Sequence, residues 1–218
     1  MEKAYKNIGY IMLILVPLVI LAFYKTYFGQ FPDFNENTSA LSHSKISIFD
    51  HIHVFFASLW ILLFIIQPLL IRFRKYKSHK IIGKVSYFLF PILILSFIHP
   101  IFRILQADHA MLAYLPISDA VLLILFYVLA IYHKKDTPKH MRYIIGTAAV
   151  FIGPIFGRIG PYIFDLHPRT INNIKFIFIY LLFTGLIVLD KKYGRNFIPY
   201  IIIICGMIIK QILFNVLL

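Results

Sequence analysis

The sequence has little charge and almost no cysteine, and both shortages narrow the class of protein. Only 14% of its 218 residues are charged and 60% are hydrophobic, whereas about a quarter of a typical soluble domain is charged. This composition excludes an ordinary soluble domain, a disordered chain and a coiled coil. The single cysteine, Cys205, excludes an internal disulfide, a Cys-x-x-Cys redox pair and a thiolate zinc site.

Long apolar runs are abundant, whereas the motifs of common soluble enzymes are missing. There is no Walker loop, Rossmann glycine motif, Gly-x-Ser-x-Gly or His-Glu-x-x-His. A hydrocarbon core of about 30 Å needs about 20 residues of helix. Allowing for polar ends, the uncharged runs predict seven helices near that length: 7–28, 50–72, 82–104, 117–133, 141–160, 171–189 and 197–217. The sequence therefore predicts an all-α polytopic membrane protein with seven transmembrane helices in a single transmembrane domain, 1–218.

The net charge of +13 is explained by membrane topology. With the N-terminus inside, most of the 22 Lys and Arg residues fall in inner loops, which is the bias of membrane proteins. The orientation predicted is N-in and C-out, in a bacterial inner (cytoplasmic) membrane. The expected partner is the lipid bilayer, with no nucleic acid. A membrane-protein partner or a homo-oligomer stays open.

Two segments of the sequence are similar to each other. The third predicted helix opens with His79-Lys80-Ile81-Ile82-Gly83 and the fifth with a His140-to-Gly146 element, and each then reaches a proline, Pro91 and Pro154. We interpret predicted helices two–three and four–five as a possible duplicated two-helix hairpin.

Histidines near the predicted outer surface are the main candidates for chemistry, because ionisable groups at membrane depth are usually functional. His51 and His53 begin the second helix, His99 is near the end of the third, and Asp119 opens the fourth. Their depths match within a few ångströms at about 1.5 Å per residue. Imidazole and carboxylate suit Zn, Cu or Fe, and two facing imidazoles suit haem b. These four residues are the predicted metal ligands.

Neighbouring residues would orient such ligands or contact a substrate, and the predicted set is Asp50, Trp60, Gln67 and Arg158. Two other interpretations stay open. In one, Asp119 and Arg158 bind a solute or proton in a transporter or accessory subunit, with a broken fifth helix lining the site. In the other, Arg158 pairs with Asp119 and the histidines cap helix ends in a purely structural network.

An inner tier of histidines includes His79 and His140. Both are expected just before helices, in turns rich in lysine and arginine, which is typical of interfacial residues that contact lipid head groups. The alternative is a second haem or metal below the first.

These elements resemble a group of uncharacterised bacterial polytopic membrane proteins over about residues 20–160. The matching elements are Lys25-Thr26-Tyr27-Phe28, His51-Ile52-His53, Trp60, Gln67, His79 to Gly83, Asp119, His140-Met141-Arg142 and Arg158. A looser similarity reaches diheme b-type cytochromes and ferric-reductase-like membrane domains. That similarity implies haem held by His53 and His99, and electron transfer is the leading hypothesis for function.

Overall fold

The computed structural model describes residues 5–33, 46–106 and 110–217, and every regular element in these ranges is a helix. Six segments have the length and composition that crossing a membrane requires: Ile48–Arg72, Tyr76–Leu105, Ala110–Tyr132, Thr137–Phe164, Pro168–Lys192 and Ile198–Leu217. The predicted all-α fold of an integral membrane protein is confirmed at this level. The chain divides into two compact units, unit 1 (Met1–Ala110) and unit 2 (Met111–Leu218).

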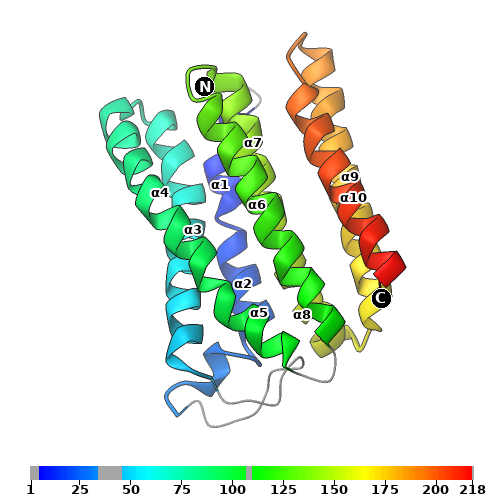
Figure 1. Cartoon of the computed structure of the whole chain (residues 1–218). Helices are drawn as coiled ribbons and strands as arrows, with labels where there is room; N and C mark the ends of the chain where they lie inside the picture. The colour runs from blue at the N-terminus through cyan, green and yellow to red at the C-terminus, as the bar shows by residue number, and fades with distance from the viewer. Residues whose placement is uncertain (1–4, 34–45, 107–109, 218) are drawn as a thin grey trace. The chain divides into compact units, whose positions relative to one another are not determined.

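Unit 1 is built on an antiparallel hairpin. Its elements are α1 (Ile8–Met12), α2 (Leu15–Phe23), the 3-10 turn η2 (Phe28–Gln30), α3 (Ile48–Arg72), α4 (Tyr76–Ser96) and α5 (Ile98–Leu105). In Figure 1, α3 and α4 form the hairpin, and α1 contacts α3. The first apolar segment, Ile8–Phe23, is shorter than the six candidate spans.

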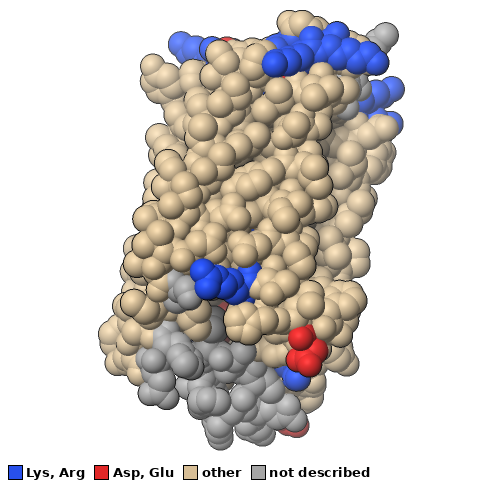
Figure 2. Space-filling model, turned by 90° about the vertical axis from the view of Figure 1, so that its right-hand side faces the viewer, with Lys and Arg blue, Asp and Glu red and all other residues tan. Residues whose placement is uncertain are grey.

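Unit 2 consists of two hairpins and a connecting helix. Its helices are α6 (Tyr114–Tyr132), α7 (Thr137–Val150), α8 (Ile152–Phe164), α9 (Pro168–Lys192) and α10 (Ile198–Leu217). The turns after α6 and after α9 lie at the same end of this unit (Figure 1). Figure 2 shows Lys and Arg gathered at one end of the face that it draws, above a largely uncharged surface. The turn after α6 carries the exposed Lys134 and Lys135, and the last turn of α9 carries the exposed Lys191 and Lys192.

Several helices begin earlier than the apolar runs predict, α4 and α7 by the most. α4 begins at Tyr76 and α7 at Thr137, where the sequence predicts 82 and 141. The side chain of Asp136 caps α7 by accepting from the backbone N–H of Lys139. Hydrogen bonds from the side chain and the backbone of Lys139 lower the pKa of Asp136. A prediction based on runs of uncharged residues leaves out first turns that contain lysine. Such turns can still be helical, because long cationic side chains extend readily from a helix to the membrane interface. His79 and His140 consequently lie inside helices, not before them as predicted.

Each unit has one long apolar segment that is interrupted near a proline. α4 and α5 meet at Phe97, three residues before Pro100, and α7 and α8 meet at Phe151, three residues before Pro154. A proline lacks the N–H that would bond the carbonyl four residues earlier, so the helix loosens there. The surrounding sequences are Phe97-Ile-His-Pro-Ile-Phe and Phe151-Ile-Gly-Pro-Ile-Phe.

Candidate functional site

The N-terminal end of α3 carries a polar network in unit 1. The N–H and the hydroxyl of Ser47 both donate to Asp50 Oδ2, at 2.8 and 2.9 Å. Arg103 of α5 donates to the same oxygen at 2.6 Å, and the Asp50 and Arg103 side chains are 16% and 15% exposed. His99 Nε2 lies 2.8 Å from the Ser47 hydroxyl and 3.9 Å from Asp50 Oδ2. A guanidinium therefore neutralises the carboxylate at the end of a helix.

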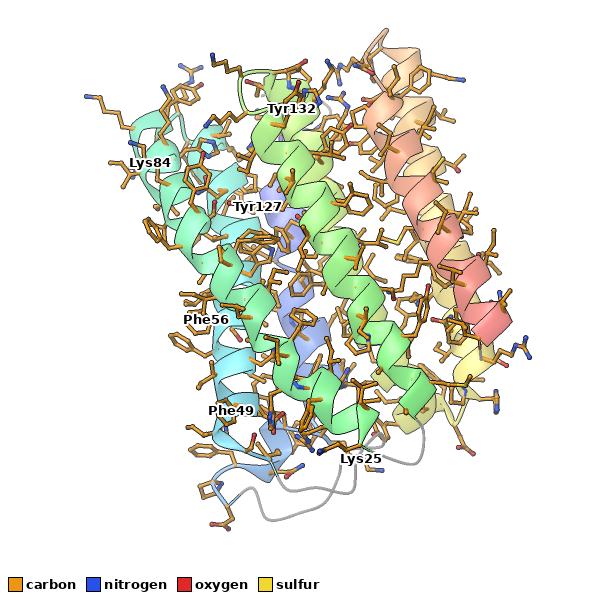
Figure 3. All side chains as sticks on the ribbon, viewed as in Figure 1. Lys25, Phe49, Phe56, Lys84, Tyr127 and Tyr132 are labelled. Carbon is orange, nitrogen blue, oxygen red and sulfur yellow. The ribbon has the colours of Figure 1, made fainter. Side chains whose placement is uncertain are left out.

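The hydrogen bonds of this network assign the proton on His99. A serine hydroxyl has one hydrogen, and that of Ser47 points to Asp50, so His99 Nε2 donates to Ser47. Figure 3 labels Phe49, whose ring lies 5.0 Å from that of His99 at the same end of α3. To bind a metal through Nε2, His99 would have to give up its bond to Ser47.

The histidines of the His-x-His element face different partners. Tyr27 Oη lies 2.6 Å from His51 Nδ1. The hydroxyl of Ser96 donates to a backbone carbonyl of its own helix, so His53 Nδ1 donates to Ser96 Oγ at 2.8 Å. The structure thus brings His51, His53 and His99 to one end of unit 1. Among the described residues, however, no group of three or more His, Cys, Asp or Glu side chains could hold a metal ion.

Other predicted residues contribute to packing and to the hairpin turns. Trp60 is 2% exposed, and its ring lies 5.1 Å from that of Phe90. With its amide oriented to satisfy both atoms, Gln67 donates to His79 Nδ1 and accepts from the N–H of Gly83 at 2.9 Å, which links α3 to α4. His140 Nδ1 lies 2.8 Å from the carbonyl oxygen of Ala130 and links α7 to α6 in the same way. Both inner-tier histidines therefore join the two helices of a hairpin.

Unit 2 contains the buried charges. Asp119 of α6 forms an ion pair with Lys210 of α10, while Lys175 of α9 donates to Asn172 Oδ1. Asp119 is 8% exposed, Lys210 5% and Lys175 4%. The hydroxyl of Tyr114 donates to the backbone carbonyl of Lys210 at 2.8 Å. Three apolar helices thus place two ammonium groups and one carboxylate in the interior of this unit.

A small cavity lies among these charges. Its volume is about 10 Å³, and its lining includes Asp119, Lys175, Lys210 and residues of α7 and α8. Gly153 of α8 faces the carboxylate, because a Cβ built at this glycine would lie 3.5 Å from Asp119 Oδ1. Since about 10–15 Å³ is enough for one water, the cavity can hold one small particle beside the charges.

A second ion pair in unit 2 is fully buried, and its two charges balance. Arg142 donates through Nε and Nη2 to the two carboxylate oxygens of Asp190, at 2.7 and 2.9 Å, and through Nη1 to the carbonyl of Pro138. Both side chains are 0% exposed. The Arg142 guanidinium lies 5.8 Å from the centre of the Tyr200 ring. This pair joins α7, α9 and α10 and has the geometry of a structural clamp.

The sequence analysis identified Asp119 but missed its partners. Lys210 interrupts the last apolar run and Lys175 lies near the start of α9, and an isolated lysine within a span is the signal that could have identified both. Arg158 of α8 donates to the carbonyl of Pro154 at 3.3 Å. The other predicted ligands, His51, His53 and His99, belong to unit 1, whereas Asp119 belongs to unit 2.

Comparisons with protein-family models, with curated proteins and with solved structures found no match to this chain. The resemblance to bacterial polytopic membrane proteins and to diheme cytochromes stays a prediction.

Proposed function

We propose that the protein is a membrane transporter, or a subunit of one, that binds a proton or a small charged solute at the Asp119–Lys175–Lys210 centre of unit 2. The observation that carries this proposal is the second ammonium: Asp119 and Lys210 neutralise each other, and Lys175 adds one buried positive charge. Burying a charge in hydrocarbon is costly, so intramembrane ionisable groups are usually retained for function.

The depth of the centre supports a role inside the membrane. At 1.5 Å per residue, Asp119 lies about 20 Å along α6 from Tyr132, and Lys210 lies about 18 Å along α10 from Ile198. Both helix ends adjoin the basic turns of unit 2. In a hydrocarbon core of about 30 Å, the centre is therefore beyond the midplane, as seen from those turns. A group at this depth is placed to exchange an ion across the remaining barrier.

We infer seven crossings with the N-terminus inside. The segment before α3 bonds to both ends of that helix: Arg72 donates to Lys6 O at 3.0 Å and to Asn7 Oδ1 at 2.6 Å, whereas Tyr27 bonds to His51. From His51 to Arg72 the helix rises about 32 Å. A segment that bonds to both ends of such a helix covers the thickness of a bilayer. The basic residues of the hairpin turns support an inner, cytoplasmic location for them, in a bacterial inner membrane.

An internal duplication is part of the same proposal. The two Phe-Ile-x-Pro-Ile-Phe elements, at Phe97 and Phe151, each follow a hairpin in which a histidine of the second helix contacts the first. This equivalence aligns Pro100 with Pro154, whereas the sequence analysis aligned Pro91 with Pro154. Repeats with interrupted helices are a common architecture of transporters, and the interruptions adjoin the ion sites. In unit 2, the cavity lies beside the interruption at Phe151.

Ion flux into liposomes tests the proposed function. We expect wild-type protein in proteoliposomes to pass protons or small anions under an imposed membrane potential, read by an internal pH dye and an external halide electrode. Asp119→Asn should lower that flux at least tenfold, because it leaves two ammonium groups without a carboxylate. Asp33→Asn, at an exposed carboxylate of unit 1, is the matched control and should keep it. Wild-type flux equal to that of protein-free liposomes, or undiminished flux in Asp119→Asn, would contradict the proposal.

The electron-transfer hypothesis concerns unit 1 and is tested on the same sample. Its ligands would be His53 and His99, and haem or a transition metal would supply the redox chemistry. His53 Nδ1 already donates to Ser96, the bond that often orients a metal-binding imidazole, but His99 Nε2 is used by Ser47. A Soret band that sharpens on dithionite reduction would favour electron transfer over the transport proposal.

A further inference from the structure

The charges around the cavity of unit 2 do not balance. Lys175 and Lys210 both line it with Asp119, and the lining residues from α7 and α8 are Ala149, Val150 and Gly153, which carry no charge. With both lysines protonated, the centre therefore holds one positive charge more than it holds negative charge. In a medium of low dielectric constant such an excess calls for a counter-ion or for the loss of a proton.

Hydrogen-bond donors at the centre are also left over. Asn172, which is 8% exposed, uses its Oδ1 to accept from Lys175, while its Nδ2 finds no acceptor among the residues that the structure describes. An ammonium has three N–H groups, yet in this part of the chain Lys175 and Lys210 each donate to a single side-chain oxygen. Buried donors without acceptors are costly, and a bound acceptor would remove that cost.

One neighbour of Lys175 favours its charged form. Its Nζ lies 4.1 Å from the centre of the Phe176 ring, where the negative face of the ring attracts a cation. Proton loss would give up this attraction and would still leave the Asn172 amide without an acceptor in its present orientation. A bound anion neutralises the excess charge and accepts from the unused N–H groups of the two lysines that line the cavity.

We propose that the unit 2 cavity binds one monatomic anion of halide size, held by Lys210 and by Lys175, the ammonium that is bonded to Asn172. The cavity of about 10 Å³ is about the space that one water needs, so an organic anion is excluded, and a halide ion fits when the flexible lysine side chains move apart. Gly153 keeps the space beside Asp119 open, because a larger side chain there would enter it. This inference names the solute of the proposed transport function and rests on that function, but anion binding is measurable without transport.

Thermal unfolding of the full-length detergent-solubilised protein tests the inference, with chloride and bromide as probes at constant ionic strength in sodium gluconate. A ligand that binds only the folded state raises the Tm with its concentration. At a halide concentration about tenfold above the Kd, we expect a rise of about 3–6 °C, which continues to grow with the logarithm of the halide concentration. A wild-type Tm that follows ionic strength alone, with no difference between halide and gluconate, would overturn the inference.

Two variants locate the binding. Lys175→Met should lose the halide-dependent rise, whereas Lys192→Met, at an exposed lysine in the last turn of the same helix, should keep it. Because Lys175→Met can also perturb folding, Asn172→Asp is the second variant. Its carboxylate supplies the missing charge and acceptor, so its Tm in gluconate should be at least that of wild type, with no response to halide. An unchanged halide response in both variants would place the anion elsewhere and contradict the proposal.

The inference and the proposed function can fail separately. Halide binding that is lost in Asn172→Asp, with no flux in proteoliposomes, would support the anion site and reject transport. Proton flux that depends on Asp119, with no halide-dependent Tm, would support transport and reject the anion. In that second case Lys175 would carry the proton instead.

Discussion

The two units place the same sequence element beside a carboxylate, with opposite results. In unit 1, Phe-Ile-His-Pro brings His99 to 3.9 Å from Asp50, and Arg103 completes a half-exposed network at a helix end. In unit 2, Phe-Ile-Gly-Pro puts Gly153 beside Asp119 and leaves a cavity there. The third residue of the repeated element, His99 in unit 1 and Gly153 in unit 2, thus distinguishes a polar cluster without a cavity from one with a cavity.

The difference between the two units also suggests different roles, helix capping for the unit 1 network and candidate ligand binding for the unit 2 centre. The unit 1 network satisfies the N-terminus of α3 and pairs its carboxylate with a guanidinium, so its geometry is explained by helix capping and charge neutralisation. The unit 2 centre lies deep within apolar helices and holds two lysines for one aspartate. Histidine count favours unit 1 as the functional site, whereas burial and charge favour unit 2.

The largest expected effect compares the two ion pairs directly. Lys210→Met removes the ammonium that is bonded to the buried Asp119 carboxylate and leaves Lys175 as the remaining ammonium at the cavity, so it should cost about 2–3 kcal/mol of folding free energy. Arg103→Met should cost only about 1 kcal/mol, because Asp50 keeps two hydrogen bonds from Ser47 near solvent. Unfolding of both variants in bicelles measures the difference. Equal losses would mean that depth does not distinguish the two carboxylates.

Much of the fold can be predicted from the hydrophobicity of the sequence, but the residues that pair with Asp119 cannot. Runs of uncharged residues locate the six candidate spans, because only an apolar helix of that length is stable in hydrocarbon. They misplace the starts of α4 and α7, since Lys77 and Lys139 belong to helices whose first turns extend beyond the apolar run. Asp119 is recognisable from its place within a span. Its pairing with Lys210 depends on which helices are neighbours, and a single sequence with no contact information does not specify that.

A smaller effect tests whether the unit 1 network is mainly a helix cap. Ser47→Ala removes the side-chain half of the capping box and the hydroxyl that accepts from His99, and should cost about 1 kcal/mol. Ser118→Ala of unit 2 is the control, because the Ser118 hydroxyl donates to Leu115 O and its neighbour Tyr114 lies in the same helix. Its effect should be within about 0.5 kcal/mol. A loss of several kcal/mol for Ser47→Ala would show that unit 1 depends on this network beyond capping.

The smallest effect on stability should be the most informative about function. Gly153→Ala adds a methyl group at ordinary contact distance from Asp119, 3.5 Å, and alanine favours a helix over glycine by up to about 1 kcal/mol. The variant should therefore unfold at or slightly above the wild-type temperature. The same methyl group occupies space beside the cavity, so ion flux and the halide-dependent rise in Tm should both fall. Gly157→Ala, in the same helix and with nothing within 4 Å of the added carbon, is the matched control and should change neither. Equal flux in the two alanine variants would mean that the space left by Gly153 is not used, and that the contrast between His99 and Gly153 concerns packing alone.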